Sequence, residues 1–118
     1  MLFGGEYSHA VLKKAKKGDF RVQDDFGGTV QKITPSKNII ALAQKTVQKL
    51  HPIPLYARVD IILNNENEAV VMELELIEPE LWFRFKEESA EKLGILVKEF
   101  INKLDSWSNW IREFINSY

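Results

Sequence analysis

The sequence predicts an α+β fold in which an antiparallel sheet packs against two or three helices. The clearest signal is a pair of strand-like segments, residues 55–63 and 69–77, separated by a short polar turn. Apolar residues recur at helical spacing after Thr34 and again over residues 88–118. With 118 residues, 45% of them hydrophobic, the chain is long enough for one buried core. We therefore expect a single domain over residues 1–118.

Composition excludes several classes of protein. The sequence has no cysteine, which rules out disulfides, thiolate zinc sites and a cysteine nucleophile. Sixteen basic and seventeen acidic residues give a net charge of −1, so we expect no nucleic-acid partner. No apolar run approaches the roughly 20 residues that span a bilayer. The first residues, Met1 to Glu6, lack the pattern of a signal peptide, so we expect a cytoplasmic protein without a membrane partner.

The first third of the chain predicts short strands. Residues 6–13 and 19–24 have strand character, and residues 16–19 supply a polar turn between them. Gly27 and Gly28 interrupt the next connection, and residues 29–33 predict a third short strand. An early basic segment runs through this region and consists of Lys13, Lys14, Lys16, Lys17 and Arg21.

A helix is expected directly after these strands. Thr34 can cap its N-terminus, and Pro35 suits the first helical position. The apolar residues that follow share one helical face: Ile39, Ile40, Ala43, Val47 and Leu50. Two prolines in residues 51–54 cannot continue the helix and are expected to end it.

The hairpin has one apolar and one charged face. Apolar side chains alternate along both strands, at Val59, Ile61 and Leu63 and at Val70, Met72, Leu74 and Leu76. The opposite face carries Arg58, Asp60, Glu73 and Glu75. Three carboxylates on one face repel one another, so a cation or a basic side chain must compensate their charge.

The length of the turn sets which of these residues meet. A turn with an even number of residues pairs Leu63 with Glu68 and places Arg58 opposite Glu73. Asp60 and Glu73 then become diagonal neighbours, about 7–8 Å apart at the backbone. An odd turn would place Asp60 on the apolar face, which the desolvation of a carboxylate disfavours. We therefore predict the even turn, formed by residues 64–67.

The last segment, residues 88–118, is predicted to be one helix with a single apolar stripe. Gly94 and the polar residues around Ser106 are points where it could bend or break. The stripe consists of Leu93, Leu96, Val97, Phe100, Leu104, Trp107, Ile111, Phe114 and Tyr118.

Two interpretations of the charged hairpin face remain open from the residues alone. Acidic clusters on antiparallel sheets are commonly solvated, with Arg58 paired to Glu73. Alternatively, the carboxylates hold a hard cation such as magnesium, which prefers oxygen ligands and often shares them with substrate phosphates.

Several of these segments occur in the order found in a known superfamily. Residues 10–23 contain Lys13 and the run Gly18-Asp19-Phe20-Arg21, and Gly27-Gly28 follows. Residues 56–60 and 71–79 then end in Met72-Glu73-Leu74-Glu75-Leu76-Ile77-Glu78-Pro79. Together with residues 5–10, this order resembles the C-terminal part of ATP-grasp ligases, in particular a glutathione-synthetase-like group that includes the cyclo-ligase of cycloserine biosynthesis. The resemblance covers about residues 3–101.

The resemblance implies an ATP-grasp C-terminal subdomain that uses ATP and Mg²⁺. Asp60 and Glu73 match metal ligands of the family, and Glu75 stands where the superfamily usually has asparagine. Arg21 and Lys13 match basic residues at the transferred phosphate and are the implied catalytic residues. The implied substrate- or phosphate-binding residues are Gln23, which replaces the family's asparagine, and Gly27, Gly28, Ser8, His9 and Arg58.

The implied reaction joins a small-molecule carboxylate to an amine. ATP phosphorylates the carboxylate, and the amine displaces phosphate from the acyl phosphate. Complete members of the family also have an N-terminal domain and a lid domain, so we expect this chain to be inactive alone. It is then either the C-terminal piece of a longer ligase or a short chain that works with another chain carrying those domains. The alternative is a non-catalytic interaction module that keeps the subdomain fold and forms a homo-oligomer through its aromatic C-terminal helix.

Overall fold

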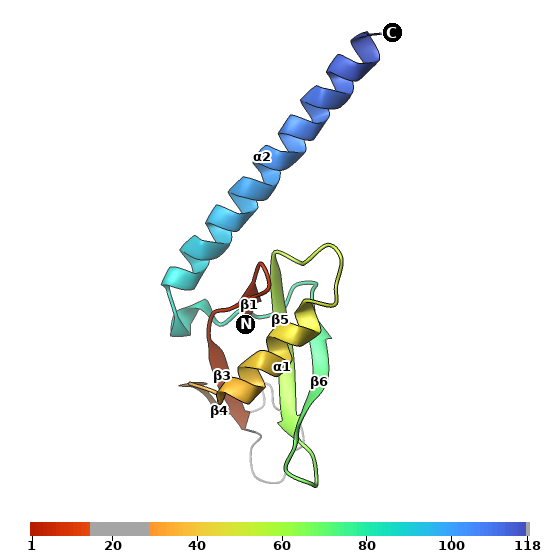
Figure 1. Ribbon diagram of the computed structural model, residues 1–118. Coiled ribbons are helices and arrows are strands. Elements are labelled where there is room, and N and C mark those ends of the chain that lie inside the picture. Colours follow the sequence, from red (N-terminus) through yellow and green to blue (C-terminus); the bar gives the residue numbers. More distant parts are fainter. Residues whose placement is uncertain (15–28, 118) are drawn as a thin grey trace.

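The computed structural model describes residues 1–14 and 29–117. Its fold is α+β, with antiparallel strands and two α-helices, as predicted (Figure 1). The strands are β1 (Leu2–Phe3), β2 (Glu6–Tyr7), β3 (Ala10–Lys14), β4 (Thr29–Ile33), β5 (Tyr56–Leu63) and β6 (Ala69–Glu75). The helices are α1 (Lys37–Val47), the 3₁₀ turn η2 (Phe83–Phe85) and α2 (Glu88–Asn116).

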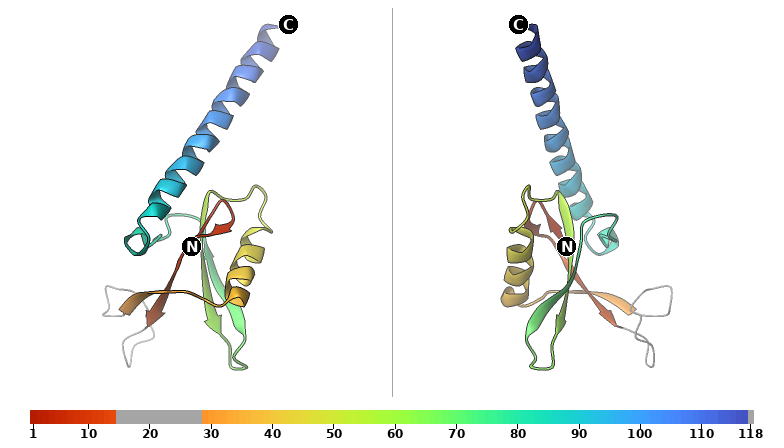
Figure 2. Two further views of the ribbon diagram at one scale, coloured as in Figure 1. Left: turned by 60° about the vertical axis from the view of Figure 1, so that its left-hand side comes forward. Right: turned by 90° about the vertical axis from the view of Figure 1, so that its right-hand side faces the viewer.

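The strands form two sheets among the described residues, where one was expected. The larger sheet has the order β2-β1-β5-β6, and β3 and β4 form a separate two-stranded ribbon. Figure 2 shows this ribbon diverging from the β5–β6 hairpin. The division arises because the predicted strand over residues 6–13 is interrupted: β2 ends at Tyr7 and β3 begins at Ala10. The predicted strand over residues 19–24 lies outside the described residues.

The chain begins with a tight hairpin that glycine makes possible. Leu2 pairs with Tyr7 and Phe3 with Glu6, so only Gly4 and Gly5 connect the two strands. Both glycines have positive φ angles, +58° and +82°. A two-residue turn of this kind suits the right-handed twist of the strands but strains any residue that has a Cβ atom.

Helix α1 starts later than the sequence indicated. Ser36, rather than Thr34, is the N-cap: its side chain accepts a hydrogen bond from the backbone N–H of Ile39. Pro35 therefore precedes the helix instead of occupying its first turn. The helix ends at Val47, before the prolines.

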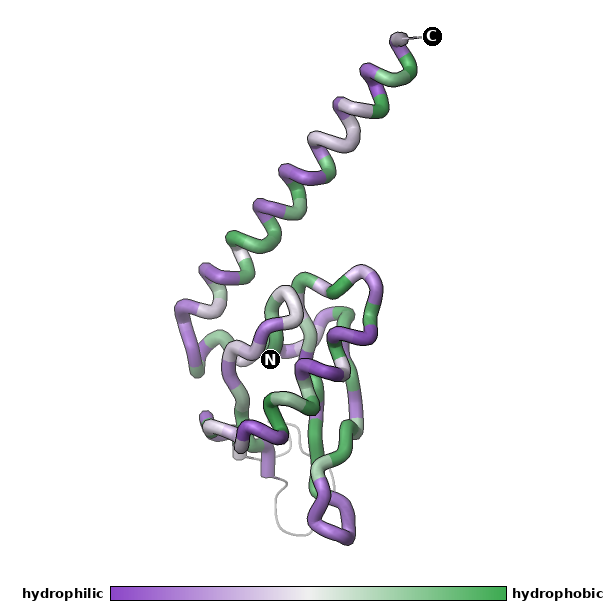
Figure 3. The backbone as a smooth tube through the Cα atoms, in the orientation of Figure 1, coloured by the Kyte–Doolittle hydropathy of each residue, from purple (hydrophilic) through white to green (hydrophobic). Residues whose placement is uncertain are grey.

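The core lies between α1 and the larger sheet. Leu2, Ala43, Val47 and Ala57 are buried there, and the apolar side chains packed against them include Val59, Ile61, Leu74 and Leu76. These residues come from β1, α1, β5 and the end of the β6 segment, so the core joins both halves of the chain. In Figure 3 hydrophobic stretches alternate with hydrophilic ones along the segments that meet here.

The β5–β6 hairpin differs from the predicted register in two places. Its loop has five residues, because Leu63 pairs with Ala69, so the predicted even turn is wrong. Asn64 closes this loop: its Oδ1 accepts hydrogen bonds from the backbone N–H groups of Glu66 and Glu68. A β-bulge follows, in which Met72 is the extra residue between the pairs Ile61–Val71 and Asp60–Glu73.

An odd loop alone would place Asp60 on the apolar face of the hairpin, and the bulge reverses this effect. It shifts the register by one residue, so Asp60 stays on the charged face and lies directly opposite Glu73, not diagonal to it. Arg58 lies opposite Glu75 instead of Glu73. The side chains of Val70 and Met72 are 36% and 59% exposed, so they do not share the core face with Leu74 as expected.

Helix α2 is continuous from Glu88 to Asn116, without a break at Gly94 or Ser106. It contacts β1 and η2 at its N-terminal end and then projects away from the sheets (Figures 1 and 2). The expectation that the sheet packs against every helix therefore holds for α1 and not for most of α2. Among the described residues, no helix has the length and apolar character needed to cross a membrane.

Candidate functional site

The charged face of the hairpin gathers three carboxylates. Asp60 on β5 and Glu73 and Glu75 on β6 each offer a carboxylate oxygen, and these oxygens lie within 4.8 Å of one another. The bulge at Met72 produces this arrangement, because it keeps Asp60 on the same face as both glutamates. The three residues predicted as metal ligands are therefore brought together.

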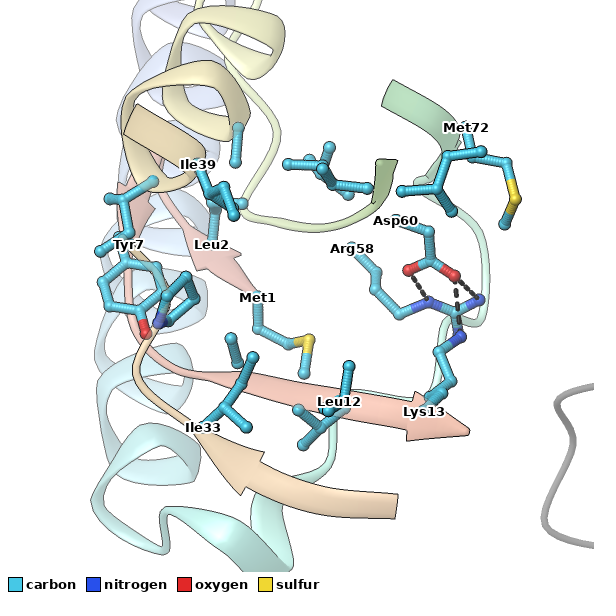
Figure 4. A pocket seen from close by; sticks show the side chains of 18 of the residues that line it. Met1, Leu2, Tyr7, Leu12, Lys13, Ile33, Ile39, Arg58, Asp60 and Met72 are labelled. Carbon is cyan, nitrogen blue, oxygen red and sulfur yellow. Dashed lines mark hydrogen bonds and ion pairs between the residues drawn. The ribbon is translucent and has the colours of Figure 1, made fainter. Parts of the chain in front are cut away.

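Two basic side chains enter the same cluster. Lys13 Nζ on β3 donates a hydrogen bond of 2.7 Å to Asp60 Oδ2. Arg58 Nε donates to Asp60 Oδ1 at 3.0 Å, and Arg58 also forms an ion pair with Glu75. Figure 4 shows Lys13 and Arg58 converging on Asp60 from two strands. Lys13 lies 47 residues before Asp60, so this contact connects the two sheets.

The cluster is partly shielded from water at Asp60 and Arg58, whereas Glu73 is exposed. The side chains of Asp60 and Arg58 are only 11% and 12% exposed, whereas those of Lys13 and Glu75 are 25% and 27% exposed. Three carboxylates and two cations leave one negative charge. Partial burial strengthens the attraction within this group and also raises the cost of leaving any member unpaired.

The donor set of the cluster suits a hard divalent cation. Magnesium takes oxygen ligands at about 2.0–2.1 Å, which places ligand oxygens roughly 3–4 Å apart, so a small side-chain adjustment would bring the three carboxylates into range. Binding would compete with the hydrogen bonds that Asp60 accepts from Lys13 and Arg58.

A cavity of about 530 Å³ opens beside the cluster. Lys13, Arg58 and Asp60 line one end of it, and the rest is mainly apolar, with Leu12, Ile33 and Ile39 among its lining residues (Figure 4). The cavity lies between the β3–β4 ribbon, α1 and β5. It offers space for a small molecule with an apolar part and a charged end.

Sequence reasoning missed this cavity. Its apolar lining residues come from strands of both sheets and from α1, and each of these elements has the ordinary alternation of a strand or helix that faces a core. Trp82, which was not singled out, also lines the cavity and is 6% exposed. Its indole Nε1 is a buried donor without a hydrogen-bond partner among the described residues. No signal in the sequence distinguishes these residues from core residues.

Ser8 and His9 lie apart from the charged cluster. They are 8% and 3% exposed, and His9 Nε2 donates to the carbonyl oxygen of Leu81 at 2.9 Å. Ser8 Oγ lies 3.1 Å from His9 Nδ1. The carbonyl oxygen of Ser8 accepts a hydrogen bond from Lys86 Nζ. Burial lowers the pKa of His9, against the opposing effect of the Leu81 carbonyl. These contacts tie β2–β3 to residues 81–86, and a role of Ser8 and His9 in substrate binding stays a prediction.

The remaining predicted site residues are Arg21, Gln23, Gly27 and Gly28, and all of them lie outside the described residues. The strands on either side of them, β3 and β4, pair along their whole length from Ala10–Ile33 to Lys14–Thr29. Their roles at the phosphates stay predictions from the resemblance.

A comparison of the chain with protein-family models, curated proteins and solved structures found no match.

Proposed function

We propose that the chain forms the metal- and phosphate-binding part of an ATP- and Mg²⁺-dependent carboxylate–amine ligase of the ATP-grasp type. The observation that carries this proposal is the convergence of Asp60, Glu73 and Glu75 with Lys13 and Arg58 beside a cavity. The order of motifs in the sequence supports the same conclusion.

Each group has a role in the proposed reaction. Asp60, Glu73 and Glu75 would hold Mg²⁺, and the metal would supply charge neutralisation for the phosphates of ATP. Lys13 and Arg58, together with Arg21, neutralise the charge that develops as the γ-phosphoryl group moves to the substrate carboxylate. The amine then attacks the acyl phosphate at its carbonyl carbon and releases inorganic phosphate. The chemistry depends on positioning and charge neutralisation and requires no protein nucleophile.

The apolar cavity is the proposed place for part of the carboxylate substrate. Its charged end lies at Lys13, Arg58 and Asp60, where the reacting group must meet the phosphates. The N-terminal and lid domains of complete ATP-grasp ligases contribute the rest of the nucleotide site, so we expect the chain alone to bind Mg-ATP weakly and to form no product.

Manganese binding tests the metal site directly. Mn²⁺ is a paramagnetic substitute for Mg²⁺, and its free concentration can be followed by electron paramagnetic resonance with and without ATP. We expect Asp60→Asn combined with Glu73→Gln to weaken Mn²⁺ binding by at least about tenfold, since two of three anionic ligands become neutral. Glu91→Gln combined with Glu99→Gln is the matched control, because it removes the same charge from exposed positions on α2. Equal binding by both double variants would refute the metal assignment.

One observation favours the second candidate, a non-catalytic interaction module. Most of α2 has no contact with the sheets, and its apolar side chains are exposed. This helix is independent of the metal site, so the two functions can be tested separately.

A further inference from the structure

The part of α2 from Ile95 onward carries a continuous set of exposed apolar side chains. Ten large ones are between 36% and 70% exposed, and four of them are aromatic. They are Ile95, Val97, Phe100, Ile101, Leu104, Trp107, Trp110, Ile111, Phe114 and Ile115. Figure 1 shows this part of the helix standing clear of the sheets.

The spacing of these side chains indicates a helical partner. From Leu93 onward the central positions alternate between steps of four and three residues: Val97, Phe100, Leu104, Trp107, Ile111 and Phe114. This seven-residue repeat has a period of 3.5, which matches a helix supercoiled around another helix, whereas a straight helix has about 3.6 residues per turn. The opposite face holds the polar residues Lys98, Glu99, Asn102, Asp105, Asn109, Arg112, Glu113 and Asn116.

The charges on α2 favour a second copy of the chain over other partners. Coiled coils that select a different partner use charges beside the apolar positions, but between Val97 and Phe114 these flanking positions hold one charge, on Lys103. The helix has four basic and five acidic residues, a balance of −1, so it has no cationic face for anionic lipids. Nothing in this charge pattern opposes self-association.

Side-chain volumes point to an antiparallel pair. If Leu104 of one copy lies against Trp107 of the other, then Phe100 meets Ile111 and Val97 meets Phe114. Every layer then combines one aromatic with one aliphatic side chain, which fills space evenly. A parallel pair would instead stack Trp107 on Trp107 next to a layer of two leucines. The antiparallel overlap, residues 97–114, also coincides with the part of the helix that stands clear of the sheets, and it places the two sets of sheets at opposite ends.

We propose that two copies of the chain associate through residues 97–114 of α2 as an antiparallel coiled coil. The area available is sufficient. At their exposed fractions, the aromatic side chains of α2 each present about 100 Å² to water. Together with the aliphatic side chains, two copies can bury roughly 1,600 Å², which is a typical area for a stable complex. This proposal does not depend on the metal site.

Sedimentation equilibrium over a range of protein concentrations tests the association. We expect a mass of twice 13.7 kDa for the unmodified chain. Leu104→Lys combined with Ile111→Lys should weaken the dimer by at least about 100-fold, because two cations replace the centre of the apolar face. Asn102→Lys combined with Asn109→Lys adds the same charge to the opposite face and should leave the dimer intact. A monomer at about 100 μM unmodified chain, or a particle of three or more copies, would overturn the proposal.

Disulfide trapping tests the orientation, since the chain has no cysteine of its own. A mixture of Val97→Cys and Phe114→Cys chains should form a cross-linked pair containing one of each. Efficient cross-linking of Val97→Cys chains with themselves would indicate a parallel pair and reject the antiparallel arrangement. Circular dichroism of each variant checks that α2 remains helical.

Discussion

The charged cluster and helix α2 differ in which side chains they expose to water. Around Asp60, the charged side chains of Lys13, Arg58 and Asp60 are partly buried, and neighbours of opposite charge stabilise them. Along α2, groups that avoid water, such as Trp107, are left exposed. The ion pairs of the charged cluster form within one chain. The exposed apolar side chains of α2 contribute to stability only when another surface covers them. Mutations should therefore act on different properties in the two regions.

The largest contrast is expected between two phenylalanines. Phe3 is 1% exposed and stacks on Phe83 at 6.1 Å between ring centroids, whereas Phe114 is 51% exposed. Phe3→Ala should lower the free energy of unfolding by about 3–5 kcal/mol, because it leaves a cavity in a packed site. Phe114→Ala should change it by less than about 0.5 kcal/mol in dilute protein. Urea titrations at low protein concentration compare the two variants, and equal losses would contradict the distinction between the core and the exposed helix.

A smaller effect is expected within the charged cluster. Asp60→Asn removes the carboxylate that pairs with Lys13 and Arg58 and should destabilise the fold by about 2 kcal/mol, since both cations are partly buried. Glu80→Gln is the matched control: it breaks the ion pair with Arg84, in which both side chains are about half exposed, and should cost no more than about 0.5 kcal/mol. Thermal unfolding measures both changes. A stable Asp60→Asn variant would show that the cluster does not hold the two sheets together.

The buried His9 makes stability depend on pH. Because burial lowers its pKa below the ordinary value of about 6.5, the unfolded chain binds a proton that the folded chain resists. Stability should therefore fall as the pH drops below about 6.5. His9→Gln can still donate to Leu81, and the difference in melting temperature between it and the unmodified chain should narrow from pH 7 to pH 5. A difference that stays constant over this range would show that His9 titrates equally in both states.

The smallest expected effect is a gain in stability within α2. A Cβ atom at Gly94 would meet nothing within 4 Å, so Gly94→Ala adds no clash and removes the entropic cost of glycine in a helix. We expect an increase of about 0.5–1 kcal/mol in the free energy of unfolding. Urea titration measures it, and a decrease would indicate that this position needs the flexibility of glycine.

Much of the local structure could be predicted from the sequence. The hairpin, the strand over residues 29–33 and the long C-terminal helix follow from periodicity, and the shared face of Arg58, Asp60 and Glu73 follows from alternation and the cost of burying a carboxylate. The reason for the five-residue loop lies in hydrogen bonds to Asn64, which alternation does not reveal.

The candidate site was also predictable in part, because strand pairing within one hairpin is a local property. The acidic residues sit on adjacent strands of one hairpin, so their proximity follows from local pairing. Lys13 was singled out by the resemblance, but its contact with Asp60 requires the β3–β4 ribbon to fold across β5. The cavity was not predictable, because its walls are ordinary apolar positions of separate elements.

By itself, the sequence determined most of the elements and the charged face of the hairpin, because these depend on side chains a few residues apart. Tertiary structure alone decided that a bulge at Met72 restores the charged face, that Lys13 meets Asp60, and that a cavity lies beside them. It also decided that the apolar stripe of α2 stays exposed. Such outcomes depend on how distant elements pack, and the free energy of packing is set by the whole arrangement rather than by any one segment.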